Sequence, residues 1–249
     1  MTKPKLSVII VAKNEEKNIL PCVESVAWAN EIIVLDSGST DDTIQLLKQA
    51  NIRIIETDWP GYGPQQNRGI DAATHEWIFS LDADERITPE LASEIRSAIE
   101  KNQFDVFDVP RKSFFVTKFM QHSDWWPDRT RRLFKKKSAR FTDHIIHASL
   151  SSNKTVGHLN EPMIHYTFHE YHSVIEKMNR YSSGSALDLN NAGKKSSLST
   201  ALGHGLWAFF RTYILKKGFL DGQAGLILAI ANAEGTYYKY LKLFELQNK

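Results

Sequence analysis

The first hundred or so residues alternate short apolar runs with stretches of helical periodicity, and this alternation constrains the fold most. The runs 6–11, 31–35, 52–55 and 76–81 are rich in Ile, Val and Leu. These runs are too short for helices, so we predict a strand in each. Helical spacing follows in 15–26, from 41, in 64–73 and from 88. Strands that alternate with helices predict an α/β fold with a mostly parallel central sheet flanked by helices.

Polar side chains follow each predicted strand at the point where it ends. In open parallel sheets, ligands bind at the carboxyl ends of the strands. The residues in question are Asn14 and Glu15, Asp36 and Ser37, Asp58, and Asp82 with Asp84. Stability of the fold alone does not explain why acidic residues follow all four strands at the same edge of the sheet. We therefore expect a ligand site at this edge.

The triplet Asp82-Ala83-Asp84 places two carboxylates just beyond the fourth predicted strand. Mg²⁺ and Mn²⁺ prefer oxygen ligands and are often held by one or two carboxylates together with substrate phosphates. A cation held there would neutralise a nucleotide diphosphate as it leaves. An isolated pair of this kind is more often a solvated turn. Its position after a buried strand, among other acids at strand ends, favours a metal site.

Two further segments of the same half carry candidate ligand-binding residues. The stretch 36–42 is a tight turn whose Ser39 or Thr40 would cap the next helix. A cap does not explain why Asp36 ends an apolar strand, and a carboxylate there would suit a base or a ribose. Arg68, close to Gln66, would hold a phosphate or else be an ordinary exposed helical residue. The sequence has neither a G-x-G-x-x-G nor a G-K-[ST] loop, so a dinucleotide or P-loop site has no support.

From about residue 104 the pattern changes to shorter strands with aromatic and basic residues. Residues 111–140 hold ten Lys and Arg against two Asp. Asp128 follows Trp125 and Trp126, a combination that suits sugar binding, and would act as the general base on an acceptor hydroxyl. The alternative is an aromatic turn in which Asp128 pairs with a nearby arginine. Asp124 and Asp143 are rival bases.

The histidines are too widely spread for a zinc motif, and most are expected to be ordinary core or surface residues. His147 is our candidate for an active-site histidine, as a further metal ligand. The single cysteine, Cys22, excludes an internal disulfide framework. With no secretory signal and no uninterrupted spanning segment, the chain is predicted to be cytoplasmic. The net charge of +2 points to no nucleic-acid partner.

The chain is predicted to be helical from about residue 171 to its end, which gives a first domain over 1–170 and a helical region over 171–249. Apolar and aromatic residues of 202–214 recur at helical spacing beside Arg211, Lys216 and Lys217. Such a stretch either packs on the main domain or docks on an anionic membrane surface. The second possibility predicts peripheral contact with the inner face of a bacterial inner membrane.

The N-terminal motifs resemble those of the family 2 glycosyltransferases. The resemblance rests on 6–10 with Asn14-Glu15, on the turn 36–41, and on 82–85, and it covers about the first hundred residues. It implies a GT-A fold, a nucleotide-sugar donor, a divalent cation (Mg²⁺ or Mn²⁺) and inversion at the anomeric carbon.

Within that family, segments 126–128, 132–134, 140–142 and 218–222 are similar to the lipopolysaccharide core β-glucosyltransferases. This similarity implies UDP-glucose as donor and an inner-core heptose of a glycolipid as acceptor. The implied metal ligands are Asp82 and Asp84, and the implied base is Asp128. Relatives often carry an acid after the histidine that corresponds to His147, where this chain has Ala148. The donor would be contacted by Ala12, Asn14, Glu15, Asp36, Ser37, Asp58, Gln66, Arg68, Asp82 and Ala83.

Three alternatives stay open. One is a glycosyltransferase that builds another bacterial surface glycan. A sugar nucleotidyltransferase would use a similar sheet and metal. Such an enzyme usually has a glycine-rich basic loop for the triphosphate, where this chain has the acidic Lys13-Asn14-Glu15-Glu16. The third is a non-catalytic binding subunit that retains the fold.

Overall fold

The computed structural model describes residues 4–142 and 149–248, and the chain divides into two compact units. The first unit comprises 1–111 and 129–165, and the second comprises 112–128 and 166–249. The short segment 112–128 therefore groups with the C-terminal helices. His147 and Asp143 lie outside the described residues.

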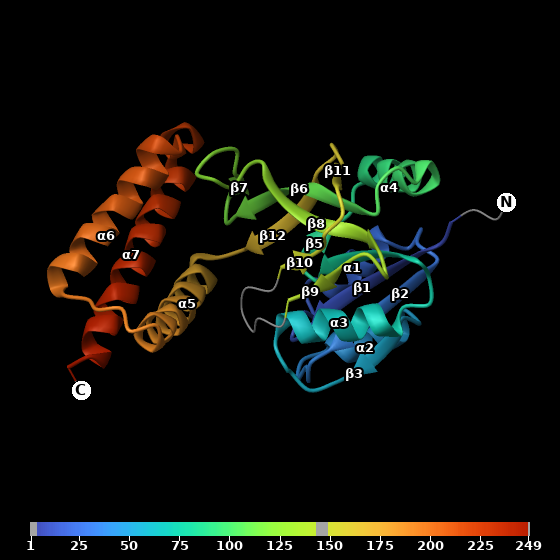
Figure 1. Cartoon of the computed structure of the whole chain (residues 1–249), viewed down its shortest axis with the longest axis horizontal. Coiled ribbons are helices and arrows are strands. Elements are labelled where there is room, and N and C mark those ends of the chain that lie inside the picture. Colours follow the sequence, from blue (N-terminus) through green and yellow to red (C-terminus); the bar gives the residue numbers. More distant parts are fainter. Residues whose placement is uncertain (1–3, 143–148, 249) are drawn as a thin grey trace. The chain divides into compact units, whose positions relative to one another are not determined.

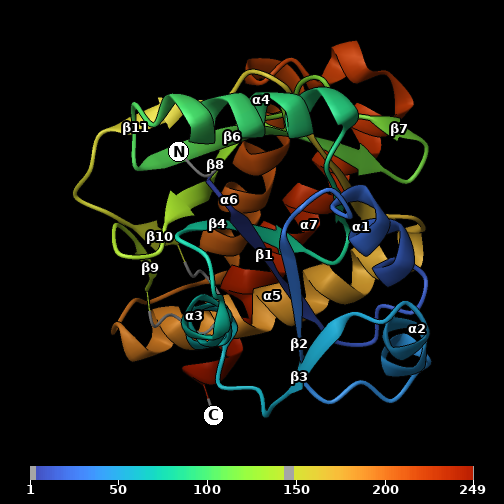
Figure 2. The same ribbon diagram turned by 90° about the vertical axis from the view of Figure 1, so that its right-hand side faces the viewer.

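The predicted alternation of strands and helices is present in the first unit (Figure 1). Four strands form a parallel sheet in the order β3-β2-β1-β4, and Figure 2 shows β1, β2 and β3 side by side. The elements are β1 (Leu6–Ala12), α1 (Ile19–Ser25), β2 (Glu31–Asp36), α2 (Thr43–Gln49), β3 (Arg53–Glu56), α3 (Tyr62–Ala72), β4 (Trp77–Asp82), β5 (Glu85–Arg86) and α4 (Pro89–Lys101).

Antiparallel strands extend the parallel sheet beyond β4. The strand β8 (Asp128–Lys135) pairs antiparallel with β4 and is followed in the sheet by β6 (Val106–Phe115), β12 (Met163–Phe168) and β5. β11 (Val156–His158) pairs with β6, while β9 (Arg140–Phe141) and β10 (Leu150–Ser151) form a separate ribbon. This extension brings residues distant in sequence next to the end of β4.

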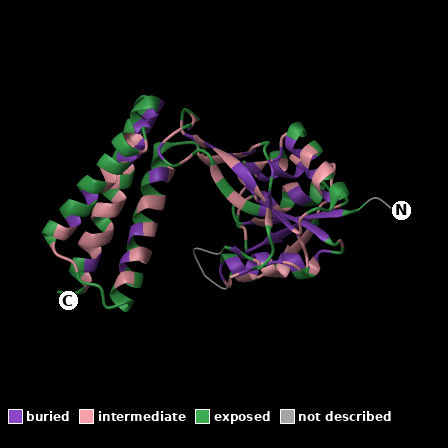
Figure 3. Ribbon diagram, turned by 45° about the horizontal axis from the view of Figure 1, so that its top comes forward, coloured by how far each residue is buried: buried purple, intermediate pink, exposed green. Residues whose placement is uncertain are grey.

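Alternate residues of the central strands enter two hydrophobic clusters, one on each face of the sheet. Val8 and Ile10 pack with apolar residues of α1, α2 and α4, whereas Ile9 packs with Ile70 of α3. The strands β1, β2 and β4 are accordingly largely buried, and buried ribbon is purple in Figure 3. Burial on both faces is the reason the strands read as continuous apolar runs in the sequence.

The helix starts show where local sequence signals hold and where tertiary contacts override them. Thr88 caps α4 by accepting a hydrogen bond from the Leu91 N–H at 3.1 Å, with Pro89 at the first helical position. The prediction that Ser39 or Thr40 caps α2 is wrong. That helix begins at Thr43, and the Ser39 hydroxyl instead accepts a hydrogen bond from the Asn14 N–H at 2.8 Å.

The second unit is mainly helical, which confirms the prediction for residues after 171. It contains α5 (Tyr171–Asn191), α6 (Leu198–Phe210) and α7 (Gln223–Leu246), together with the short strand β7 (Lys118–Phe119). A π-helical turn (Arg211–Leu215) and a 3₁₀ turn (Gly218–Asp221) connect α6 to α7. α7 packs against both α5 and α6.

Helix α6 approaches α7 closely through small residues. Ala201 and Gly205 are buried, and a Cβ on Gly205 would lie 3.1 Å from the Tyr237 Cβ. The large apolar residues of α6 are on its exposed surface. Across residues 4–142 and 149–248, no helix combines the length and the apolar character that crossing a bilayer requires.

Candidate functional site

The order of the parallel strands identifies the edge where a ligand site is expected. The connections run outward from β1 to β2 and β3, and then return to place β4 on the other side of β1. Ligands bind beyond the carboxyl ends of the strands at such a reversal. There Ala12 at the end of β1 is paired with Asp36 of β2, and Val11 is paired with Asp82 of β4. The structure thus brings the ends of three predicted strands together.

Asp36 is fully buried and organises the turn that follows β2. Its Oδ1 accepts hydrogen bonds from the N–H groups of Gly38 at 2.9 Å and Ser39 at 2.8 Å, and its Oδ2 accepts one from the Ser39 hydroxyl at 2.5 Å. Gly38 has a φ of 84°, a conformation that favours glycine. The buried Ser37 hydroxyl accepts a hydrogen bond from Gln65 Nε2 at 3.0 Å. The carboxylate of Asp36 therefore fixes the conformation of this loop.

Hydrogen bonds between side chains and backbone N–H groups connect the loop after β1 to the segment after β2. Asn14 has a φ of 55°, and its Oδ1 accepts a hydrogen bond from the Thr40 N–H at 2.8 Å. The Glu15 N–H donates to the Thr43 hydroxyl at 2.8 Å. These contacts explain why α1 begins only at Ile19, later than the helical spacing from Glu15 suggested.

Burial gives Glu15 an unusual protonation behaviour. Desolvation raises the pKa of its carboxyl to about 7, against a hydrogen bond from Asn18 that lowers it, while the charge of Asp84 adds to the rise. The Asn18 Nδ2 donates to Glu15 Oε2 at 2.8 Å. Glu15 therefore titrates near neutral pH beside the acidic triplet.

Asp82 is held by a buried arginine from β8. Arg132 Nη2 donates to Asp82 Oδ2 at 2.5 Å and to Glu85 Oε1 at 2.8 Å, and Arg132 and Glu85 are both buried. The Asp82 N–H donates to Glu85 Oε2 at 2.9 Å, and Arg111 lies 3.5 Å from Glu85. Burial raises the pKa of Glu85, while the positive charge of Arg132 opposes that shift. One buried guanidinium thus pairs with two carboxylates, the buried Glu85 and the partly exposed Asp82.

Asp84 is also partly exposed, with its side chain 28% exposed. Its Oδ2 is 3.2 Å from Nε2 of His165 on β12. Carboxylate oxygens and an imidazole form a donor set that suits Mn²⁺ or Mg²⁺. Residues 4–142 and 149–248 contain no cluster of three or more His, Cys, Asp or Glu arranged to hold a metal. The donors present fit a cation that takes its remaining ligands from substrate phosphates and water.

The other predicted donor-binding residues lie nearby in the first unit. Asp58 and Arg68 are paired, with Arg68 Nη1 at 2.6 Å from Asp58 Oδ1, and both are exposed or half-exposed. Gln66 is buried on α3, accepts a hydrogen bond from the Ser80 hydroxyl at 2.8 Å, and places its amide nitrogen 3.5 Å from Asp82 Oδ1. Ala83 is buried between the two aspartates of the triplet.

The predicted base and its rivals belong to the second unit or lie outside the described residues. Asp128 is the first residue of β8 and is half-buried. Asp124 is held by Arg211 at 2.5 Å and Lys216 at 2.6 Å. Although partial burial raises its pKa, these two cations bring the pKa of Asp124 below its usual range. A carboxylate stabilised in this way is a poor proton acceptor, which disfavours Asp124 as the base.

Sequence reasoning missed three residues next to the triplet. Glu85 follows the triplet directly, but its burial could not be read from the motif. Arg132 and His165 come from β8 and β12, which no local pattern places next to β4. His165 is the histidine that the described structure sets beside Asp84, while His147 lies outside the described residues. An arginine at a buried strand position was the one available signal, since such a residue requires acidic partners.

The raised pKa of Glu15 predicts how stability depends on pH. A carboxyl whose pKa is higher in the folded protein destabilises the fold as pH rises from about 4.5 to about 7. We expect Glu15→Gln to raise the free energy of unfolding at pH 8 by up to about 3 kcal/mol, and by little at pH 5. Urea unfolding in EDTA at both pH values measures this. An equal effect at the two pH values would contradict the raised pKa.

Comparison with known proteins agrees with this geometry. Residues 7–155 match the family described as "Glycosyl transferase family 2". An uncharacterized glycosyltransferase of Rickettsia felis is 30% identical over 257 residues, covering 97% of this chain and 90% of that protein. The lipopolysaccharide core biosynthesis glycosyltransferase LpsC of Rhizobium meliloti is 26% identical over 255 residues, covering 96% of this chain and 94% of that protein.

Solved structures are more distant from this chain. Residues 1–349 of TarS from S. aureus give a TM-score of 0.49 at 16% identity, covering 98% of this chain and 92% of that one. Glucosyl-3-phosphoglycerate synthase of Mycobacterium tuberculosis, in complex with Mn²⁺, UDP and glucosyl-3-phosphoglycerate, gives 0.38 at 25% identity, covering 45% and 44%. The family match spans more than half of the chain, and the full-length relatives agree with it. The chain therefore belongs to glycosyltransferase family 2, and its α/β fold is of the GT-A type.

Proposed function

We propose that this glycosyltransferase moves glucose from UDP-glucose to a heptose of a lipopolysaccharide inner core, with the help of a divalent cation. The observation that carries the proposal is the acidic triplet at the carboxyl end of β4, beside Glu15 and Asp36 where the strand order reverses. The choice of acceptor is supported by the similarity to LpsC over nearly the whole chain.

The donor would lie across the ends of β1, β2 and β4. The rigid turn built on Asp36 offers its backbone and Ser37 to the nucleoside, and the partly exposed Arg68 offers its guanidinium to a phosphate. We assign donor contact to Ala12, Asn14, Glu15, Asp36, Ser37, Asp58, Gln66, Arg68, Asp82 and Ala83.

Asp82 and Asp84 would hold the cation, with His147 or His165 as a further ligand. When bound, such a cation neutralises the charge that develops on the leaving diphosphate. Arg132 keeps Asp82 oriented, since the guanidinium lies 2.5 Å from its Oδ2. Inversion needs one base on the acceptor side and no covalent intermediate. We assign that role to Asp128.

A direct assay tests the proposed reaction. Purified protein with UDP-glucose, Mn²⁺ and a core glycolipid that lacks the added glucose should release UDP only when the acceptor is present. EDTA should abolish the release, and added Mn²⁺ should restore it. UDP release with UDP-galactose but not UDP-glucose would overturn the donor assignment. Pyrophosphate release from UTP and a sugar phosphate would support a nucleotidyltransferase instead.

We also propose that the second unit docks on an anionic membrane through α6. The large apolar residues of α6 face solvent, with Leu206 72% and Trp207 54% exposed, while its small residues pack on α7. An ordinary surface helix has the reverse pattern. Exposed apolar patches of this kind mark interaction sites. The exposed set on α6 and the turn after it comprises Leu198, Leu202, Leu206, Trp207, Phe210, Ile214 and Leu215.

Charge favours a lipid surface as the partner of this face. Residues 192–220 contain five Lys and Arg and no Asp or Glu. Basic side chains beside an apolar helix face bind the headgroups of anionic lipids while the apolar residues enter the interface. This location would give the enzyme access to a membrane-anchored glycolipid on the inner face of the inner membrane.

Vesicle flotation tests the docking. We expect the protein to float with vesicles that contain phosphatidylglycerol and to float less in high salt, because screening weakens the charge attraction. Leu206→Glu should weaken flotation at least about tenfold, since a buried leucine contributes about 1.5–3 kcal/mol. The control is Leu187→Glu on α5, which replaces another exposed leucine (50%, against 72% for Leu206) and should float as the parent does. Failure of the parent protein to float at low salt would contradict the proposal.

A further inference from the structure

The connection between α6 and α7 buries an aspartate that no step of the proposed reaction uses. Asp221, in the 3₁₀ turn that precedes α7, has a side chain only 1% exposed. Two glycines hold this turn against the start of α7, because a Cβ on Gly225 would lie 1.8 Å from the Gly218 carbonyl oxygen. Gly222 has a φ of 66°, a conformation that favours glycine. The position of Asp221 within the second unit is therefore fixed by the backbone around it.

Both carboxylate oxygens of Asp221 accept hydrogen bonds from a segment about 100 residues earlier in the chain. The Gln121 N–H donates to Oδ1 at 3.2 Å, and the His122 N–H donates to Oδ2 at 2.9 Å. The Lys118 Nζ lies 3.7 Å from Oδ1. Charge balance alone would require only the lysine. Two consecutive backbone N–H groups that share one carboxylate also fix the orientation of the main chain at 121–122.

The next two residues have a main-chain conformation that is uncommon outside glycine. The φ angles of Ser123 and Asp124 are 64° and 66°. The Ser123 N–H donates to the Lys216 carbonyl oxygen at 2.8 Å, and the Asp124 carboxylate is paired with Arg211 and Lys216. Residues in such conformations persist only where the surrounding contacts hold them, and they cluster at functional sites.

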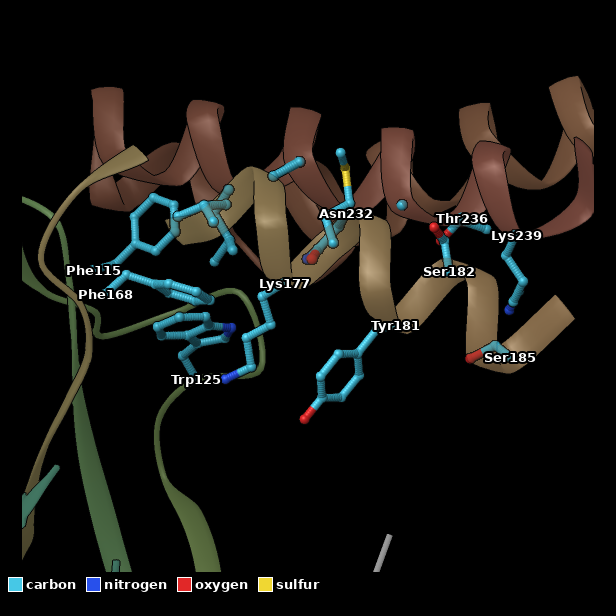
Figure 4. A pocket seen from close by; sticks show the side chains of 15 residues that line it. Phe115, Trp125, Phe168, Lys177, Tyr181, Ser182, Ser185, Asn232, Thr236 and Lys239 are labelled. Carbon is cyan, nitrogen blue, oxygen red and sulfur yellow. The ribbon is translucent and has the colours of Figure 1, made fainter. Parts of the chain in front are cut away.

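Trp125 anchors the far side of this segment in a small aromatic core. Its ring stacks on Phe168, with centroids 6.4 Å apart and 28° between the planes, and Phe115 packs edge-on against it at 5.4 Å. Figure 4 shows these three rings together. The chain then continues to Trp126, which is 37% exposed, and to Asp128. Contacts at 121–125 thus hold in place a surface loop of the kind that carries binding residues on a rigid scaffold.

We propose that Asp221 is a positioning residue for the acceptor. By fixing the segment 121–128, it keeps the Trp126 ring and the Asp128 carboxylate in one orientation toward the acceptor sugar. The inference rests on the proposed function, which assigns the base to Asp128. Trp126 offers an apolar ring surface with a polar edge, which suits a sugar ring. Asp221 is buried and acts through this segment without touching the substrate.

Hydrogen exchange followed by mass spectrometry on the full chain tests the positioning without any substrate. In the parent protein the amides of 119–126 should exchange slowly, although β7 ends at Phe119. Asp221→Asn keeps the size of the side chain but turns an amide N–H₂ toward a backbone N–H. Exchange in 119–126 should then be at least about tenfold faster, while α5 is unchanged. The control Asp188→Asn replaces an exposed aspartate of α5 and should leave exchange in 119–126 as in the parent.

The transfer assay separates positioning from simple stabilisation. Asp221→Asn should lower kcat/KM for the acceptor at least about tenfold and change KM for UDP-glucose less than about twofold, because only the acceptor side is misplaced. Faster exchange throughout α5 and α7 with unchanged kcat/KM would overturn the proposal, since Asp221 would then only stabilise the second unit. Fast exchange of 119–126 in the parent would overturn it even if the variant did not fold. Slow exchange in a parent that transfers no glucose would contradict the proposed acceptor and not the fixing of this segment.

Discussion

Asp84→Ala should lower acceptor-dependent UDP release at least about a hundredfold, while the protein remains folded. The side chain is partly exposed beside His165, so its loss leaves no cavity in the core. The same change would remove a hard oxygen donor from the proposed cation site, where the charge of the leaving diphosphate would be neutralised. Loss of one group that stabilises developing charge costs two to three orders of magnitude in comparable enzymes.

The readout is the rate of UDP release in Mn²⁺, together with Mn²⁺ binding followed by electron paramagnetic resonance in the presence of UDP. Asp188→Ala serves as the control, because it removes an exposed aspartate from α5 without touching the first unit. It should keep full activity. An Asp84→Ala protein with parental rates and parental Mn²⁺ binding would refute the metal site.

Arg132→Met should lower the free energy of unfolding by about 3–5 kcal/mol, the cost of breaking a buried ion pair. Arg132 is buried together with Glu85, and its guanidinium lies within 2.8 Å of carboxylate oxygens of both Asp82 and Glu85. Methionine fills a similar volume but supplies no charge, so Glu85 is left buried without its main counter-ion. Urea unfolding at pH 8 measures the difference.

The comparison that isolates burial is Arg53→Met, since Arg53 also pairs with a glutamate but is about half exposed. That change should cost about 1 kcal/mol or less. Adding Glu85→Leu to Arg132→Met should recover part of the loss, because the uncompensated buried charge is then removed. If Arg53→Met and Arg132→Met were equally destabilising, the buried ion pairs of Arg132 would contribute no more to the free energy of unfolding than an exposed ion pair does.

The parallel half of the fold was predictable because strands that are buried on both faces consist of consecutive apolar residues, which are visible in the sequence. The position of Asp36 and Asp82 at strand ends followed from the same pattern. Their partners did not follow, because Arg132 and His165 reach the triplet through strand pairing across 50 and 81 residues. The cap of α2 was mispredicted for a related reason. Ser39 and Thr40 bond to Asn14, a contact between two loops that competes with the local one.

The outward-facing leucines of α6 have a consequence for kinetics. An enzyme seated on a lipid surface meets a membrane-anchored acceptor by diffusion in two dimensions. Its rate then depends on the number of acceptor molecules per unit area of bilayer. Diluting the acceptor with inert lipid should slow the reaction, whereas diluting the whole suspension with buffer should not. Gly205 packs α6 against α7 and leaves the leucines of α6 facing outward. This packing would thereby make the rate depend on the surface concentration of the acceptor rather than on its bulk concentration.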